Sequence, residues 1–162
     1  ASGLPDHSVD LAVAAQAAHW FDLDRYYAEV RRVVRPGGLV ALIVYGIHLC
    51  DDPKIDRVVK EFYGQTLSAY WPPQRKLVED EYRTIPFPFP EIKAPKFEMK
   101  ANWNLEEMLG YVETWSATAA MAKAGGHAQI DAFRGNISLE WGDPQTRRTI
   151  RWPLSMRVGR CT

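Results

Sequence analysis

Two apolar segments near the start of the chain have the pattern of buried β-strands. Val9, Leu11 and Val13 alternate with smaller residues, which predicts a strand over 8–15. Residues 39–45 form a second, continuously apolar segment. A strand of this kind is typical of a parallel sheet that helices cover on both faces. We therefore predict two buried strands within the first 45 residues.

The segment between these strands has a helical period. From Leu23 to Val34, apolar residues recur every three or four positions among charged ones, which predicts an amphipathic helix. Asp22 precedes the helix and is its expected N-cap. Pro36-Gly37-Gly38 is expected to end it, because proline cannot continue the helix and glycine favours the left-handed turn that closes a helix end. Strand, helix and strand then make one right-handed βαβ unit.

The remaining sequence alternates between helical periods and strand periods. Helices are predicted over about 53–68, 75–82 and 104–115, and in a region interrupted by Gly125-Gly126 that extends to about Phe133. Strands are predicted over 96–103 and 148–161, and Pro153 indicates an edge position or a bulge in the second. The prolines of 85–90 forbid both helix and central strand there, so this segment is expected to be an extended connector.

Composition limits the class of protein. The chain has 162 residues, of which 46% are hydrophobic and 25% charged, so we expect one globular domain over 1–162 and exclude disordered and fibrous classes. Twenty basic residues balance twenty acidic ones, which gives no electrostatic reason to expect a nucleic-acid or membrane partner. No apolar segment is long enough to span a bilayer. Cys50 and Cys161 lack metal-site spacing, so we expect no metal, and a reducing, cytoplasmic location.

Four short motifs resemble those of class I S-adenosylmethionine-dependent methyltransferases. They are Ala1-x-x-Leu4-Pro5, Ser8-Val9-Asp10-Leu11, Ala17-Ala18-His19-Trp20-Phe21-Asp22 and Arg31-Arg32-Val33-Val34-Arg35-Pro36-Gly37-Gly38-Leu39. In their order and spacing they are similar to the fourth strand, the following helix and the fifth strand of that family. Segments 103–116 and 152–158 resemble its trans-aconitate methyltransferase branch. The resemblance implies an α/β, Rossmann-like sheet that ends in an antiparallel pair of strands, with 1–46 as the βαβ unit, 47–147 as the acceptor region and 148–162 as the final strand.

Two features of this family do not occur in the chain. A glycine-rich turn between a strand and a helix and an acidic residue at the end of the second strand would contact S-adenosylmethionine. Gly37-Gly38 instead precedes a strand, and Gly125-Gly126 follows a helical stretch. The chain therefore resembles only the C-terminal part of the family, and we expect cofactor binding by it alone to be weak or absent.

The resemblance nevertheless places several residues at the cofactor. It implies contacts from Ala1, Gln16, Ala17 and His19, of which the last three follow the first predicted strand. Ligands of open α/β sheets bind at this carboxyl edge. Alternative roles stay open, since Gln16 is equally suited to satisfy loop backbone, His19 and Trp20 to pack at a helix start, and Asp22 to cap the helix.

Methyl transfer makes few demands on side chains, because holding the nucleophile in line with the methyl group supplies much of the acceleration. A carboxylate acceptor needs no base. An alcohol or amine does, and His19 is then the candidate catalytic residue, because its ordinary pKa is near working pH.

Aromatic residues outside the βαβ unit are the candidate acceptor pocket. The candidates for substrate binding outside it are Tyr70, Trp71, Tyr111 and Trp115, and Trp20 within the βαβ unit is a fifth candidate. Tyr111 and Trp115 are four positions apart on one predicted helix, so packing in the core is the competing explanation. Arg75, Arg83, Arg147 and Arg148 are able to pair with an acceptor carboxylate or to lie on the solvated surface.

Three functions remain open at this point. The first is methylation of a small molecule, a carboxylic acid among the candidates, by S-adenosylmethionine. The second is a non-catalytic methyltransferase remnant, and the third is a small-ligand binding module. In the family the fourth strand pairs with the first, so the strand at 9–14 would have an exposed edge. We expect a second copy to cover that edge in a homodimer or a swapped assembly.

Overall fold

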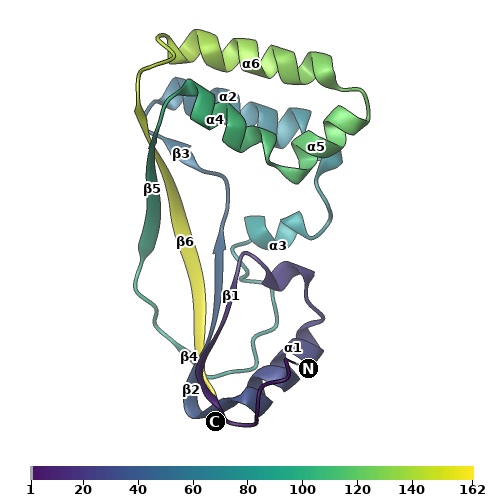
Figure 1. The fold of residues 1–162 in the computed structure, drawn as a ribbon, viewed down its shortest axis with the longest axis vertical. Coiled ribbons are helices and arrows are strands. Elements are labelled where there is room, and N and C mark those ends of the chain that lie inside the picture. The colour runs from purple at the N-terminus through teal and green to yellow at the C-terminus, as the bar shows by residue number, and fades with distance from the viewer. Residues whose placement is uncertain (1) are drawn as a thin grey trace. The chain divides into compact units, whose positions relative to one another are not determined.

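The computed structural model describes residues 2–162, which form two compact units (Figure 1). Unit 1 comprises the residues up to Gly46 together with Gln74–Glu98 and Pro153–Thr162. Unit 2 comprises Ile47–Pro73 and Met99–Trp152. None of the helices formed by the described residues has the length and apolar character that crossing a membrane requires.

Unit 1 is built on the predicted βαβ unit. Strands β1 (Val9–Ala15) and β2 (Val34–Tyr45) are parallel, and helix α1 (Leu23–Val33) connects them. The Asp22 carboxylate accepts a hydrogen bond from the backbone N–H of Arg25 at 3.2 Å, which confirms the predicted N-cap. The α/β prediction and the parallel direction of the first two strands are therefore confirmed.

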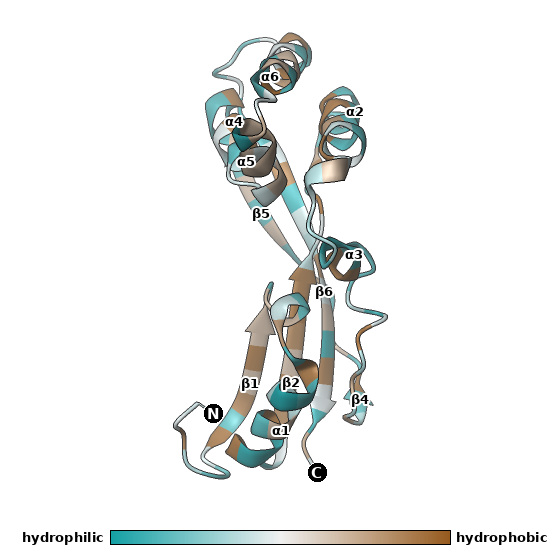
Figure 2. Cartoon of the chain, turned by 90° about the vertical axis from the view of Figure 1, so that its right-hand side faces the viewer, coloured by the Kyte–Doolittle hydropathy of each residue, from teal (hydrophilic) through white to brown (hydrophobic). Residues whose placement is uncertain are grey.

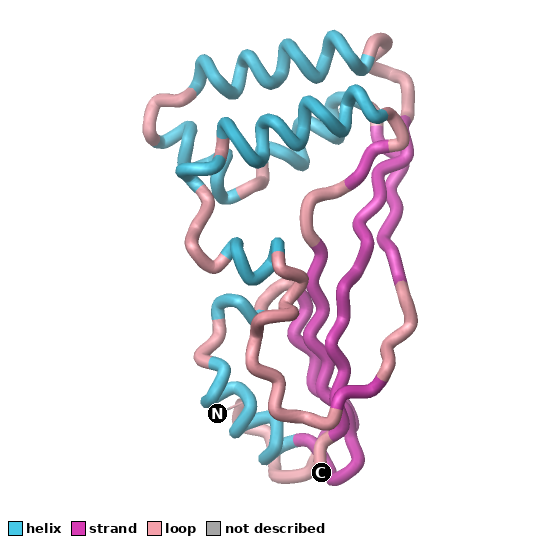
Figure 3. Tube along the Cα trace, turned by 180° about the vertical axis from the view of Figure 1, so that it is seen from behind, coloured by secondary structure: helices cyan, strands magenta, loops and turns pink. Residues whose placement is uncertain are grey.

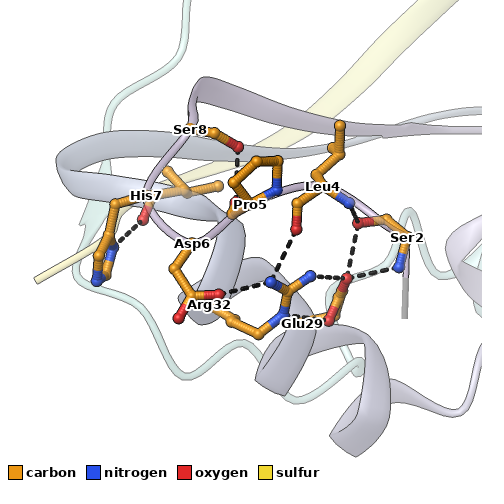
Figure 4. Close-up of polar contacts among 9 residues, drawn as sticks. Ser2, Leu4, Pro5, Asp6, His7, Ser8, Glu29 and Arg32 are labelled. Carbon is orange, nitrogen blue, oxygen red and sulfur yellow. Dashed lines mark hydrogen bonds and ion pairs between the residues drawn. The ribbon is translucent and has the colours of Figure 1, made fainter.

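The segment before β1 is held against α1 by polar contacts (Figure 4). The Arg32 guanidinium donates to the Leu4 carbonyl at 2.8 Å and to the Asp6 carboxylate at 2.6 Å. Glu29 accepts from both the backbone N–H and the hydroxyl of Ser2. The Arg32 guanidinium also donates to the Glu29 carboxylate. This contact, followed by those from Ser2, holds the pKa of the Glu29 carboxyl well below its usual range. They fix the chain as it enters β1.

Pro36-Gly37-Gly38 does not end the helix as predicted. Helix α1 stops at Val33, and the three residues lie inside β2. Val9 pairs with Val34 and Leu11 with Leu39, so β2 bulges between these pairs. Gly37 has the left-handed φ of 81° that the bulge requires, and its N–H donates to the Cys161 carbonyl at 2.7 Å. The helix ends earlier because Val34 already pairs with β1.

Among the described residues of unit 1, the helices and the connector 85–90 pack against one face of the sheet. On the covered face α1, α3 (Arg75–Glu79) and the connector 85–90 bury residues such as Val34, Leu42 and Tyr82. The opposite face carries exposed or half-buried apolar residues, namely Leu11, Val13, Leu39, Ile43, Met156 and Val158. Figure 2 shows the apolar colour continuing along β1 and β2.

Strand β6 (Arg148–Arg160) completes the sheet. Its Leu154–Arg160 segment pairs antiparallel with β2, and Ile150 and Arg151 pair with β3 (Leu49–Cys50), in the strand order β1-β2-β6-β3. The short strand β4 (Glu91–Ile92) and strand β5 (Phe97–Trp103) also pair with β6, so the predicted pairing of the last two strands is confirmed. The edge position expected from Pro153 is wrong, because β6 lies between β2 and β3. Pro153 instead falls between the two pairing segments.

Unit 2 consists mainly of helices, which the trace in Figure 3 shows. They are α2 (Pro53–Glu61), a π-helix (Phe62–Thr66), a 3-10 helix (Ser68–Tyr70), α4 (Leu105–Glu113), α5 (Ser116–Lys123) and α6 (His127–Trp141). All but the 3-10 helix were predicted in outline, but the predicted ends were wrong in two places. The helix that begins at Asn104 ends at Glu113, before Trp115, and the last helix runs to Trp141 rather than to Phe133.

Strand β5 is more exposed than its sequence pattern indicates. Phe97 and Met99 alternate with charged residues, as in a strand with one buried face, but they are 56% and 38% exposed. Trp103, at the end of the strand, is partly buried among other aromatic rings. Burial therefore begins only in the part of β5 that belongs to unit 2.

Candidate functional site

The residues after β1 join the carboxyl ends of β1 and β2. The Gln16 amide donates to the Tyr45 carbonyl and accepts from the Tyr45 N–H, both at 3.0 Å. Gln16 itself has a φ of 53°, the left-handed conformation that is uncommon for residues other than glycine. Its polar side-chain atoms thus satisfy backbone, one of the alternatives left open by the sequence. Cofactor contact by Gln16 and by the neighbouring Ala17 stays a prediction, and Ala1 lies outside the described residues.

His19 lies in the same loop and contacts a buried tyrosine. The short helix Ala18–Trp20 places its Nδ1 atom 2.6 Å from the Tyr82 Oη atom. Partial burial, followed by the positive charge of Arg75, lowers the pKa of His19 below 6.5. A neutral imidazole therefore predominates at neutral pH. If Nδ1 donates to Tyr82, Nε2 keeps the lone pair that a general base needs.

Tyr82 is positioned by unusual backbone. Glu81 and Tyr82 have φ values of 55° and 59°, so two consecutive non-glycine residues adopt the left-handed conformation. The Tyr82 ring is fully buried, and its backbone N–H donates to the Leu77 carbonyl at 2.9 Å. Backbone strain of this kind is concentrated at functional sites. It supports a positioning role for Tyr82 beside His19.

Trp20 and Tyr70 differ in exposure. Trp20 packs beside His19, with a centroid distance of 4.9 Å, and is 58% exposed. Tyr70 ends the 3-10 helix of unit 2 and is half-buried. Both remain predictions as acceptor contacts.

Aromatic residues from separate segments of unit 2 contact one another. We call them the aromatic cluster, and they are His48, Tyr63, Trp71, Trp103, Tyr111, Trp115 and Trp152. The cluster includes Trp71, Tyr111 and Trp115, which the sequence had singled out. The structure therefore brings three of the five predicted acceptor residues together.

Local hydrogen bonds set the positions of Tyr111 and Trp115. The capping box of Asn104 and Glu107 starts α4, which carries Tyr111. Trp115 lies outside that helix as the N-cap of α5, and the Thr118 hydroxyl donates to the Val112 carbonyl at 3.0 Å across the break. The two rings meet edge to face at 6.0 Å. Their contact thus spans the break between α4 and α5 instead of lying within one helix.

The arginines considered for an acceptor carboxylate have other partners. Arg83 pairs with Glu81, Arg147 with Glu107, and Arg148 with Asp52. Arg75 acts electrostatically on His19. The alternative explanation, a position on the solvated surface, fits Arg83 and Arg147, whereas the Arg148 side chain is only 21% exposed.

Open hollows on unit 2 lie away from the predicted site residues. One of about 370 Å³ follows α2, one of about 240 Å³ lies between α2 and α6, and one of about 450 Å³ lies between α4 and α6. The predicted site residues line none of these three. Within the aromatic cluster, the rings that contact one another have centroids 4.8–6.0 Å apart.

Comparison with known proteins assigns the family. Residues 1–42 match the model of the methyltransferase domain family. A candidate type II methyltransferase of Anaeromyxobacter dehalogenans has a solved structure that is 45% identical, with a TM-score of 0.90, and the match covers 98% of this chain and 67% of that one. This chain belongs to the class I S-adenosylmethionine-dependent methyltransferases.

Curated methyltransferases match over shorter parts. A candidate methyltransferase of Dictyostelium discoideum is 36% identical over 124 residues, which are 75% of this chain and 47% of that protein. An uncharacterized methyltransferase of Mycobacterium tuberculosis is 52% identical over 40 residues, 25% of this chain and 16% of that protein. The chain thus spans about half or less of the length of these curated relatives.

The methyltransferase cofactor fits the described residues only in part. His19 and the backbone of Ala17 lie at the carboxyl edge of the parallel strands, where a nucleoside ligand of this fold is expected. Among residues 2–46, however, Asp10 pairs with Arg35, and Asp22 caps α1. Neither carboxylate is available for ribose hydroxyls, so we derive no step through the cofactor.

Sequence reasoning missed three residues that contact the candidate residues within each unit. Tyr82 lies 63 positions from His19, and no local pattern connects the two. His48 is buried among aromatic rings although it follows a turn. Trp152 had been assigned only to the last strand, yet its Nε1 atom donates to the Tyr111 hydroxyl at 3.0 Å. A composition rich in tryptophan was the one signal that pointed towards this cluster.

Proposed function

We propose that this chain provides the acceptor side of an enzyme that transfers a methyl group from S-adenosylmethionine to a small molecule. The proposal treats both units as parts of one methyltransferase domain. Family membership carries it. Two separate features support it, namely a neutral His19 at the carboxyl edge of the sheet in unit 1 and the aromatic cluster in unit 2.

His19 distinguishes two classes of acceptor. An alcohol or amine loses a proton, which Nε2 of His19 would accept while Tyr82 holds the ring through Nδ1. A carboxylate acceptor, the class that the resemblance implies, loses no proton when it is methylated. The natural protein that contains these residues should therefore be assayed with S-adenosylmethionine and with all three acceptor classes, and the methylated products measured by mass spectrometry.

The His19→Gln variant separates these classes. If the acceptor is an alcohol or amine, kcat should fall by about 10²–10⁴-fold. Tyr82→Phe should shift the pH profile of kcat while leaving the acceptor KM nearly unchanged, because Tyr82 positions the base. Unchanged kcat in His19→Gln would assign a carboxylate acceptor. Failure to transfer methyl groups to any class, together with no binding of S-adenosylhomocysteine, would overturn the proposal.

The described residues 2–162 contain no glycine-rich turn between a strand and a helix. The isolated chain should therefore bind the cofactor weakly or not at all. Isothermal titration calorimetry of the 162-residue chain with S-adenosylhomocysteine measures this directly. We expect no saturable binding at micromolar concentrations. Micromolar affinity at one site per chain would show that these residues suffice.

We also propose that a second copy of the chain covers β1. Strand β1 ends the sheet order, and Leu11 and Val13 are each 50% exposed on the apolar face opposite α1. The formal net charge is zero, so two copies do not repel each other strongly. Light scattering should give the mass of a dimer. A monodisperse monomer whose β1 amides are protected from hydrogen exchange would contradict this assembly.

A further inference from the structure

His48 is a buried polar side chain without a hydrogen-bonding partner. It lies in the connection between β2 and β3 and is 1% exposed. Neither Nδ1 nor Nε2 has a hydrogen-bond partner among the described residues. A buried polar group left unpaired destabilises a protein, so such groups call for a specific explanation.

Three aromatic side chains surround the imidazole. The centroids of Tyr111, Trp115 and Trp152 lie 5.5, 5.9 and 5.8 Å from that of His48. The Tyr111 hydroxyl already accepts a hydrogen bond from the Trp152 indole. Rings thus provide flat apolar walls, whereas the two imidazole nitrogens are the unpaired polar atoms between them.

The outer part of the cluster is suited to admit a guest. Tyr63, Trp71 and Trp115 are only partly buried, in contrast to His48. Trp115 lies at the break between α4 and α5, and Tyr63 lies on the π-helix, an element frequently found at functional sites. Trp115 is thus a partly exposed ring that contacts His48 directly.

The charge of the site indicates the class of guest. Burial is the cause that lowers the pKa of His48 to about 4, so the imidazole is neutral at pH 7. A buried anion or cation needs a charged partner to offset its desolvation. A hydroxyl needs none, because it can donate to one imidazole nitrogen or accept from the other.

We propose that His48 is the hydrogen-bonding residue of the acceptor site and that this site binds an uncharged, planar molecule with a hydroxyl group. That the bound molecule is a methyl acceptor rests on the proposed function. The recognition itself depends only on His48, Tyr111, Trp115 and Trp152. It favours an alcohol-type acceptor over the carboxylic acid that the resemblance implies.

Binding of small aromatic probes tests this recognition without cofactor or turnover. Phenol, toluene, benzoate and benzyltrimethylammonium should be titrated into the full chain and followed by tryptophan fluorescence and calorimetry. Phenol should bind about tenfold more tightly than toluene, the ratio expected for one net hydrogen bond of about 1.4 kcal/mol. His48→Phe should remove this difference, whereas the same substitution at the exposed His127 should preserve it.

A measurement on the unaltered protein covers the case in which His48→Phe does not fold. The ¹⁵N resonances of the His48 imidazole should shift with phenol and stay in place with toluene. Equal binding of phenol and toluene, or tighter binding of either charged probe, would overturn the inference. Phenol binding without any methyl transfer would leave the inference standing and remove the proposed function. Methyl transfer to a molecule that leaves the His48 resonances unmoved would support the proposed function and overturn the inference about His48.

Discussion

At the scale of single residues, long-range pairs decide the candidate site. His19 was predicted from its place after a strand, but its partner Tyr82 comes from a segment whose sequence shows only turn and helix signals. His48 was missed because local periodicity carries no information on which rings surround a side chain. Residue types were thus predictable, and their partners depended on tertiary packing.

His48 should make the stability of the protein depend on pH. Its folded-state pKa of about 4 lies below the ordinary 6.5, so the unfolded chain binds the proton first as the pH falls. The stability is therefore complete above pH 6.5 and decreases as the pH falls towards 4. For this one group the decrease is about 3 kcal/mol at pH 4.

Urea unfolding at a series of pH values measures this effect. The free energy of unfolding of the wild type should fall more steeply than that of His48→Phe between pH 6.5 and 4. Parallel curves for the two proteins would show that the imidazole is not held neutral by burial.

Gly38 should tolerate no side chain at the bulge of β2. A Cβ atom there would lie 2.6 Å from Cγ1 of Val34 and 2.8 Å from the backbone oxygen of Asp10. Because the second neighbour is backbone, Gly38→Ala should destabilise the protein by about 1–3 kcal/mol. The same change at Gly135, in the exposed interior of α6 with nothing within 4 Å, should stabilise by about 0.5–1 kcal/mol. Thermal unfolding of both variants compares the two, and equal shifts would contradict the account of the bulge.

At the scale of elements, helix starts were more predictable than helix ends. The caps Asp22 and Asn104 lie beside the residues that they bond, so a short sequence window contains the whole interaction. The ends depend on more distant partners. Helix α1 ends before Val34 because Val34 pairs with Val9. The break after α4 is stabilised by the hydrogen bond from Thr118 of the next helix to the Val112 carbonyl.

Removal of the α4 cap tests one of these starts. The Asn104 side chain accepts from the Glu107 N–H, and the Glu107 carboxylate accepts from the Asn104 N–H. Asn104→Ala should lower the free energy of unfolding by about 1 kcal/mol. Asn136→Ala, in the exposed middle of α6, is the matched control and should be neutral or slightly stabilising. Equal losses in chemical denaturation would assign no role to the capping box.

At the scale of the whole molecule, the α/β class and the parallel start of the sheet followed from the sequence because strand and helix periods are local signals. The position of β6 between β2 and β3 did not follow from the sequence, because Pro153 suggests an edge strand when the pairing partners are unknown. The aromatic cluster likewise required the structure. Its members come from positions between 48 and 152, and only folding brings them together.

The central claim is that the aromatic cluster receives the methyl acceptor. The most direct test is the KM for the acceptor in the natural protein and its Trp115→Ala variant, with transfer of a deuterated methyl group from S-adenosylmethionine followed by mass spectrometry. Loss of the Trp115 ring should raise this KM by at least about tenfold and leave the affinity for S-adenosylhomocysteine unchanged. An unchanged KM would place the acceptor elsewhere and contradict the account.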